Sequence, residues 1–292
     1  MATVRITMAE AVVRFLAAQR IDGDIPLFAG VWAIFGHGNV AGLGPALHGA
    51  RSKLPTYRAH NEQAMAHAAV AFAKAHARRR IMACTTSIGP GASNMVTAAA
   101  VAHVNRLPVL FLPGDIFASR RPDPVLQQLE DFGDPTASVN DCFRPVSRYF
   151  DRITRPEQIL VSLPSALRVL LDPADCGPVT LALPQDVQTE AYDYPAEFFR
   201  RRVHRIRRPL PDAEELQEAV KQMKAAKRPL IIAGGGVVYA EASAQLRAFA
   251  EATGIPVADT HAGKGARTGC RHARSRDARS TTLSGALGRL RA

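Results

Sequence analysis

The sequence predicts an α/β protein with a doubly wound parallel sheet, followed by an incomplete second α/β domain. Short apolar runs alternate with Ala-rich segments of helical periodicity, and a glycine turn often follows a run. Hydrophobic residues make up 47% of the 292 residues and aromatic residues only 6%. Such a composition is typical of Ala-rich helices on aliphatic strands. Strand and helix in alternation imply right-handed crossovers, which cover both faces of a parallel sheet.

The elements of the first domain follow from these patterns. Thr7 and Glu10 have the spacing of a capping box, so a helix is predicted from Thr7 to about Arg20. Further helices are predicted over residues 61–78, from residue 92, and over residues 156–171. Strands are predicted over residues 31–35, around residue 57, and over residues 81–85, 109–112 and 179–183.

Four segments are predicted along the chain. Residues 1–190 form the first domain, and 191–211 form an Arg-rich linker. Residues 212–266 begin a central α/β domain, with a helix after Asp212 and a strand that ends at a triple-glycine turn, 234–236. Residues 267–292 lose all periodicity and are expected to be a disordered basic tail.

The net charge of +11 is concentrated in two arginine-rich segments, within residues 200–208 and 267–292. Neither segment interleaves aromatic residues with its charges, so a solvated linker and tail are favoured over a nucleic-acid surface. Four widely spaced cysteines without a CxxC pair indicate free thiols and no metal site: Cys84, Cys142, Cys176 and Cys270. No apolar run is long enough to span a membrane, and we expect a cytoplasmic protein.

Three segments are expected to meet at the carboxyl ends of the strands, where open parallel sheets bind ligands. They are GHG (residues 36–38), HNE (60–62) and SIGPGASN (87–94). Glycine lets backbone approach a flat ligand closely, and Glu62 is the only carboxylate in the three segments. On the residues alone, the favoured reading of Glu62 is an ordinary first-turn acid that the helix dipole stabilises.

Three motifs resemble, in order and spacing, the pyrimidine-binding domain of the acetolactate synthase superfamily of thiamine-diphosphate enzymes. They are HNEQAMAHAA (60–69), TSIGPGASN (86–94) and LPVLFLPG (107–114). Further segments are similar to one branch, the ring-opening diketone hydrolases of myo-inositol catabolism: FGHGNV (35–40), PDPVLQQLE (122–130), VNDCFRPVSRYF (139–150) and ALPQDV (182–187). The resemblance extends over about residues 1–266.

This resemblance implies thiamine diphosphate and Mg²⁺ as cofactors. Glu62 aligns with the carboxyl group that hydrogen-bonds the pyrimidine nitrogen and so activates the cofactor. The implied reaction cleaves a C–C bond of a cyclic trihydroxy-1,2-diketone, and water then releases 5-deoxyglucuronate. No GxSxG elbow is present, so this hydrolysis would not use a serine triad.

The other implied site residues have simpler readings as well. Gly36 and His37 align beside the pyrimidine or substrate, although a turn glycine and a surface histidine fit equally. Ser87, Gly89, Pro90 and Asn94 align with a cofactor cleft, although a turn and a helix-stabilising asparagine also fit. Gln127 and Gln128 lie near a substrate-facing glutamine of the family, and the alignment leaves open which one corresponds.

Other features limit the expected activity. Tyr239 stands where a dinucleotide fingerprint needs its third glycine, so no FAD is expected at the triple-glycine turn. The family holds the diphosphate and Mg²⁺ through a GDG motif, which this sequence lacks. We therefore expect the chain to be inactive alone, as a truncated or frameshifted product of a homo-oligomeric family. The alternatives are a 2-keto-acid lyase or transferase subunit of a split enzyme, completed by a separate cofactor-domain chain, and a non-catalytic interaction module.

Overall fold

The computed structural model describes residues 2–121, 125–128, 131 and 133–266, together with the backbone of 281–282. It divides into two compact units, Met1–Arg207 and Arg208–Ala292.

The first unit is built on a six-stranded parallel sheet with the strand order β5-β4-β6-β7-β9-β8. The strands are β4 (Phe28–Ala33), β5 (Thr56–Arg58), β6 (Ile81–Thr86), β7 (Leu110–Asp115), β8 (Tyr149–Arg152) and β9 (Val179–Pro184). Every residue of β6, β7 and β9 is buried, as expected for central strands that are covered on both faces. The predicted parallel α/β sheet is confirmed.

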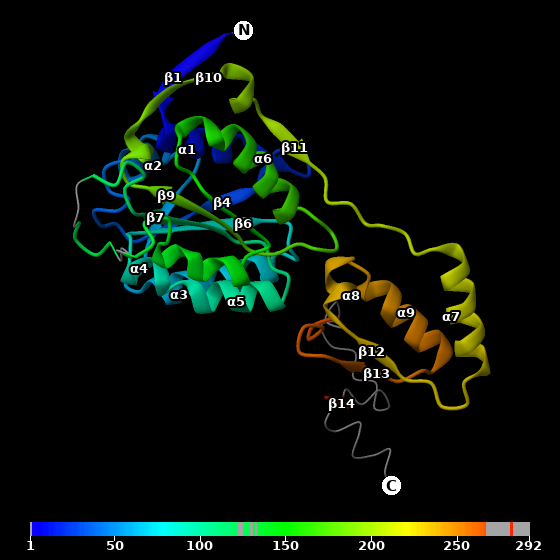
Figure 1. The fold of residues 1–292 in the computed structure, drawn as a ribbon. Coiled ribbons are helices and arrows are strands. Elements are labelled where there is room, and N and C mark those ends of the chain that lie inside the picture. Colours follow the sequence, from blue (N-terminus) through cyan, green and yellow to red (C-terminus); the bar gives the residue numbers. More distant parts are fainter. Residues whose placement is uncertain (1, 122–124, 129–130, 132, 267–280, 283–292) are drawn as a thin grey trace. The chain divides into compact units, whose positions relative to one another are not determined.

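Helices cover both faces of this sheet (Figure 1). One layer contains α1 (Met8–Ala18), α2 (Leu43–Ala50) and α6 (Ile159–Leu170), and the other contains α3 (Glu62–Ala75), α4 (Pro90–Ser93) and α5 (Val96–Val104). The capping box at the start of α1 is present, with the Glu10 amide donating to the Thr7 hydroxyl at 3.2 Å and the Thr7 amide donating to the Glu10 carboxylate at 3.0 Å.

Two helices differ from their predicted bounds. The helix predicted over 61–78 ends at Ala75, because Ala77 and Arg78 adopt positive φ angles of 48° and 65°. The helix predicted from residue 92 is two helices, α4 and α5, separated by Asn94 and Met95.

Two small sheets are not predicted by the sequence patterns. β1 (Thr3–Thr7) pairs antiparallel with β10 (Ala191–Pro195), and β2 (Gln19–Ile21) pairs with β3 (Ile25–Pro26) and β11 (Arg202–His204). Short 3₁₀ turns occur at Val139–Val146, Pro156–Gln158, Val187–Thr189 and Ala196–Phe199. The segment predicted as a linker, 191–211, therefore contains two strands that pair with the first unit.

The second unit contains the predicted helix after Asp212, α7 (Ala213–Ala225), whose backbone amides Asp212 caps. It continues with β12 (Ile231–Ala233), α8 (Gly235–Tyr239), α9 (Ser243–Thr253), β13 (Val257–Asp259) and β14 (Thr281–Thr282), and the three strands form a parallel sheet. Apart from Thr281 and Thr282, the predicted tail and Cys270 lie outside the described residues. Within the part of the chain that the structure describes, no helix is long and apolar enough to cross a membrane.

Candidate functional site

Glu62 is the first residue of α3, and its position follows from the local sequence. Asn61 is extended and caps the helix, with its side-chain oxygen accepting from the Ala64 amide at 2.9 Å. The preceding strand β5 is parallel to β4, so the loop between β5 and α3 delivers Glu62 to the carboxyl edge of the sheet. The side chain is half-buried there, and the positive end of the 14-residue helix favours a carboxylate.

The Glu62 carboxyl group meets Asn94, which the sequence analysis also selected. The Asn94 amide nitrogen donates to Glu62 Oε2 at 2.9 Å. The other oxygen, Oε1, lies beside Gly91: a Cβ atom at residue 91 would be 3.4 Å from Glu62 Oε1 and 2.9 Å from Thr86 Oγ1. The backbone of Gly91 thus passes close to one carboxyl oxygen and one hydroxyl, and we call the place bordered by Gly91 and these two atoms the Gly91 niche.

Two buried polar atoms in this region have no hydrogen-bond partner among the described residues. They are Thr86 Oγ1, on a fully buried residue at the end of β6, and His37 Nε2, in the loop after β4. Burying such an atom unpaired costs about 1–3 kcal/mol, so each marks a place where a ligand can supply the partner. Sequence reasoning selected His37 but missed Thr86, whose only signal was its place before the glycine turn.

The two predicted glycine turns pack directly against each other. A Cβ at Gly36 would lie 2.6 Å from Ser87 Oγ, and one at Gly38 would lie 2.7 Å from the Ile88 nitrogen. The Ser87 hydroxyl accepts from the Gly38 amide at 3.3 Å. The structure therefore brings Gly36 and Ser87 together, and it commits the Ser87 hydroxyl to holding the turn.

Gly89 and Pro90 join this edge to the loop after β7. Gly89 has a φ of 65°, and a Cβ on it would lie 1.9 Å from the Gln127 carbonyl oxygen, so only glycine fits. Pro90 is the first residue of α4, where its missing amide hydrogen costs nothing. Of the two candidate glutamines, Gln127 is exposed, whereas Gln128 is buried, with Oε1 accepting from the Phe117 amide at 3.4 Å and Nε2 unpartnered among the described residues.

Gln188, which sequence reasoning did not select, ties three segments of the edge together. Its amide nitrogen donates to the carbonyls of Gly38 and Leu183 at 2.8 Å each, and its oxygen accepts from the Leu43 amide at 3.3 Å. The residue is 1% exposed. Because all three partners are backbone atoms, and two of them belong to a distant segment, no local pattern identifies this role.

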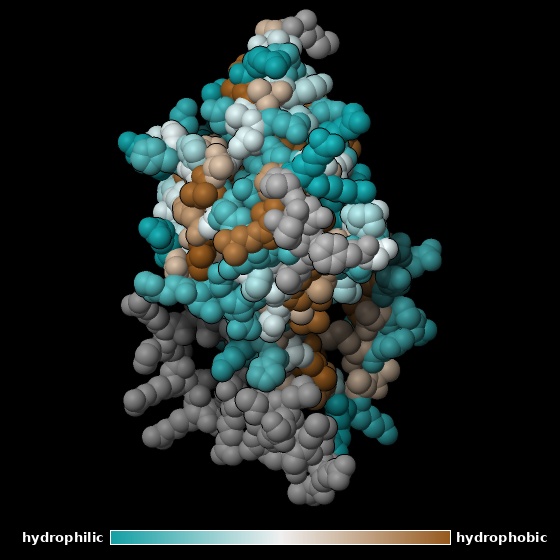
Figure 2. All heavy atoms as spheres, turned by 60° about the vertical axis from the view of Figure 1, so that its left-hand side comes forward, coloured by the Kyte–Doolittle hydropathy of each residue, from teal (hydrophilic) through white to brown (hydrophobic). Residues whose placement is uncertain are grey.

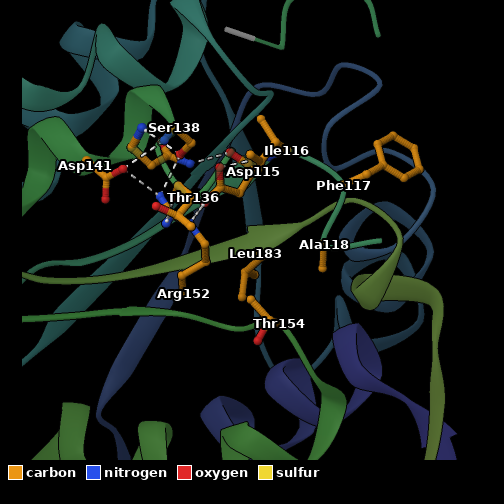
Figure 3. Close-up of polar contacts among 12 residues, drawn as sticks. Asp115, Ile116, Phe117, Ala118, Thr136, Ser138, Asp141, Arg152, Thr154 and Leu183 are labelled. Atoms are coloured by element: carbon orange, nitrogen blue, oxygen red, sulfur yellow. Dashed lines mark hydrogen bonds and ion pairs between the residues drawn. The ribbon is translucent and has the colours of Figure 1, made fainter. Parts of the chain in front are cut away.

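A buried ion-pair network stiffens the end of β7 (Figure 3). Arg152 of β8 donates to the fully buried Asp115 at 2.7 Å, and also to Ser138 and Asp141 at 2.8 and 3.1 Å. The second Asp115 oxygen accepts from the Ile116 amide at 2.8 Å. Each buried charge is thereby paired and hydrogen-bonded, as burial requires.

The pKa values within this network shift in opposite directions. Burial alone would raise the pKa of Asp141, but the Ser138 amide and the guanidinium groups of Arg144 and Arg152 outweigh it and lower this pKa below its ordinary value. Burial alone would lower the pKa of Arg152, and the charges of Asp115 and Asp141 raise it above its ordinary value instead. Asp141 and Arg152 are therefore both charged at neutral pH.

The carboxyl edge also carries apolar surface. Figure 2 turns the side with the loop after β7 toward the reader and shows apolar side chains among polar ones. Val40 and Leu126, in the loops after β4 and β7, are 50% and 73% exposed. Within the described ranges, no group of three or more His, Cys, Asp or Glu side chains could hold a metal ion.

These features suit one end of a flat, nitrogen-containing ring. Glycine backbone and Glu62 Oε1 border the Gly91 niche, and Thr86 and His37 each have a polar atom that is unpaired among the described residues. The residues present thus fit the pyrimidine ring that the resemblance implies.

Comparison with known proteins assigns both units to one family. Residues 6–134 match the N-terminal TPP binding domain of thiamine pyrophosphate (thiamine diphosphate) enzymes, and residues 216–269 match their central domain. Over 269 residues, the chain is 55% identical to the 3D-(3,5/4)-trihydroxycyclohexane-1,2-dione hydrolases of Bacillus cereus strain AH820 and Bacillus anthracis, and 54% identical to that of Bacillus thuringiensis strain Al Hakam. The match covers 91% of this chain and 42% of each relative, so the chain spans about two fifths of the length of these relatives. This chain belongs to the thiamine pyrophosphate enzymes.

Proposed function

We propose that this chain supplies the pyrimidine-binding side of a thiamine-diphosphate site that hydrolyses a C–C bond of 3D-(3,5/4)-trihydroxycyclohexane-1,2-dione. The observation that carries the proposal is the position of Glu62 Oε1 beside the Gly91 niche and Thr86. The substrate rests on the 55% identity to hydrolases of that name. Mg²⁺ for the diphosphate, a role in myo-inositol catabolism, a homo-oligomeric assembly and a cytoplasmic location complete the proposal.

Thiamine diphosphate, when bound, supplies a nucleophilic carbon and an electron sink for breaking a bond next to a carbonyl. In this proposal Glu62 holds a proton at a ring nitrogen of the pyrimidine, and the turns at Gly36 and Gly91 let backbone lie against the ring. The unpaired atoms of His37 and Gln128 are candidates for hydrogen bonds to the hydroxyl and carbonyl groups of the diketone.

The cofactor half of the proposal is tested with the pyrimidine of thiamine alone, 4-amino-5-hydroxymethyl-2-methylpyrimidine, which we call the pyrimidine probe. A Kd of 1 mM corresponds to about −4.1 kcal/mol, a modest demand on such a fragment. We expect the probe to shift the NMR amide signals of residues 36–38 and 86–94 at millimolar concentration, and Glu62→Gln to weaken binding about tenfold. Equal affinity of the wild type and Glu62→Gln would refute this half.

The substrate half is tested by exchange. The 269 matched residues of the Bacillus cereus hydrolase are replaced with those of this chain, and hydrolysis of the diketone and consumption of pyruvate are both measured. We expect the chimera to hydrolyse the diketone, and Glu62→Gln to lower its kcat/KM by at least 100-fold. Consumption of pyruvate without diketone hydrolysis would overturn the substrate assignment.

A further inference from the structure

The two oxygens of the Glu62 carboxyl group face different neighbours. Oε2 accepts a hydrogen bond of 2.9 Å from the Asn94 amide nitrogen, and Oε1 borders the Gly91 niche. Asn94 is itself held in place, because it ends α4 and its backbone amide donates to the Pro90 carbonyl at 3.1 Å. Among the residues that the structure describes, the short helix thus delivers a fixed donor to Oε2.

This difference between the two oxygens affects which of them carries the proton of a protonated Glu62 carboxyl group. A side-chain amide nitrogen donates and never accepts, and a carboxylate accepts only, so the Asn94 NH₂ group must face Glu62. The carbonyl oxygen of a protonated carboxyl group is a better acceptor than its hydroxyl oxygen. A hydrogen bond from this NH₂ group to Oε2 therefore favours a carboxyl proton on Oε1.

We propose that Asn94 is a positioning residue that directs the proton of Glu62 to Oε1 and into the Gly91 niche. The proposal rests on the proposed function, because a proton site there matters only if a ring nitrogen occupies the niche. In this proposal Asn94 acts through Glu62. The family resemblance had instead implied that Asn94 lines the cofactor cleft itself.

The surroundings of Oε1 favour this role. Gly91 adds no side chain between Oε1 and the niche, and the unpartnered Thr86 hydroxyl lies 2.9 Å from the same Cβ position. The niche therefore presents one oriented proton and one free hydroxyl to a ligand that carries both acceptor and donor nitrogens, as an aminopyrimidine does.

The first test needs no ligand. The ¹H–¹⁵N signal of the Asn94 side-chain amide, assigned by its loss in Asn94→Ala, reports the contact with Glu62 directly. We expect Glu62→Gln to shift this signal, whereas Glu10→Gln, at the first turn of another helix, leaves it in place. If the Asn94 side-chain amide signal does not shift in Glu62→Gln, the proposal is overturned.

The second test measures the Kd of the pyrimidine probe in a double-mutant cycle on the full chain. Asn94→Ala is expected to weaken binding at least fivefold in the wild type and less than twofold in the Glu62→Ala background, where no side-chain group remains for Asn94 to position. Asn105→Ala is the matched control: Asn105 also ends a helix, and its amide nitrogen donates to the Val101 carbonyl at 2.9 Å. It is expected to leave the Kd unchanged, and thermal melts verify that every variant folds.

The outcomes separate the two proposals. If Glu62→Gln leaves the Kd unchanged, the proposed function fails. If Glu62→Gln weakens binding and Asn94→Ala does not, the positioning role alone fails. A loss for Asn94→Ala that is as large in the Glu62→Ala background as in the wild type would show direct contact with the probe, and would also overturn positioning.

Discussion

The unpaired hydroxyl of Thr86 should contribute to binding of the pyrimidine probe but not to the stability of the folded chain. Thr86 is fully buried, and Oγ1 has no partner among the described residues. Replacing it with the isosteric Val removes an unsatisfied polar atom, so Thr86→Val should leave the free energy of unfolding unchanged or raise it by up to about 1 kcal/mol. The same change should weaken binding of the pyrimidine probe several-fold. Denaturant titration and NMR titration check the two effects, and a clearly less stable Thr86→Val would show that the hydroxyl is satisfied in the folded chain.

Two glycines of one turn should respond differently to alanine. At Gly89, a Cβ meets the Gln127 carbonyl and the φ is positive, so Gly89→Ala should destabilise the chain by roughly 2 kcal/mol or more. At Gly91, φ is ordinary and a Cβ would meet Thr86 Oγ1 at 2.9 Å and Glu62 Oε1 at 3.4 Å, so Gly91→Ala should cost less than Gly89→Ala yet place a methyl group in the Gly91 niche. Chemical denaturation and probe binding measure the pair. Retained probe binding in Gly91→Ala would count against the niche.

Single residues of the site differ in how far the sequence could predict them. Glu62, Asn94 and Gly36 stand inside local motifs next to strand ends, and the resemblance of these motifs to a known family selects them. Gln188 has no such context, because its role lies in hydrogen bonds to backbone atoms of other segments. The contact between Asn94 and Glu62 was also beyond prediction, since it joins the starts of two different crossovers.

At the scale of elements, the ion pair between β7 and β8 should be costly to break from one side. Arg152→Met keeps much of the side-chain volume but leaves the fully buried Asp115 without its cation. Breaking a buried pair in this way typically costs about 3–5 kcal/mol, so we expect a loss of that size. The double variant Arg152→Met with Asp115→Leu should recover part of it. Denaturant midpoints measure both variants, and a double variant no more stable than Arg152→Met would contradict the account.

Asp141 gives the same network a pH dependence. Its pKa in the folded chain is lowered, so its contribution to stability is present above its unfolded value of 3.8 and is lost as pH falls through the folded value. Asp141→Asn should therefore be less stable than the wild type at pH 7, and the difference should shrink below about pH 4. Thermal melts from about pH 7 to about pH 2.5 provide the measurement. Glu218→Gln, which removes an exposed carboxylate that pairs with Lys221 and accepts from the Gln222 side-chain amide, is the control. A constant difference between Asp141→Asn and the wild type across this range would be inconsistent with the lowered pKa.

Helices and strands were predicted correctly where the sequence shows a clear apolar pattern. They were missed where a strand depends on pairing with a distant strand. Central strands such as β6 and β9 are continuous apolar runs and were found to within one residue. β1 and β10 are mixed in polarity and exist because each supplies hydrogen bonds to the other, although Arg5 and Asp193 in these strands are 188 residues apart in the sequence. The end of α3 was missed because the left-handed residues after it are Ala and Arg, which carry no turn signal.

At the scale of the whole molecule, the boundary between the two units depends on side-chain contacts that cannot be predicted from amino-acid composition. Residues 191–211 resemble a linker because they are rich in arginine. In the structure, Tyr194 is fully buried with its hydroxyl donating to the Pro156 carbonyl at 2.9 Å, and Phe198 stacks on Phe15 with ring centroids 4.6 Å apart. Aromatic anchors thus fasten the arginine-rich segment to the first unit, and the second unit begins at Arg208.

The two units should also differ in stability. The first unit encloses a continuous core around β6, β7 and β9, whereas α7 and α9 bury none of their own residues in the part of the chain that the structure describes. Helices without a buried apolar face are marginal in water, so we expect amide hydrogens of α7 and α9 to exchange at least about 100-fold faster than those of β7. Hydrogen exchange followed by mass spectrometry tests this, with peptides from α1 as an internal reference for a buried helix. Equal protection of α7 and β7 would mean that α7 gains a covering surface in solution, and the exposed Leu216, Val220 and Met223 would then form the contact face.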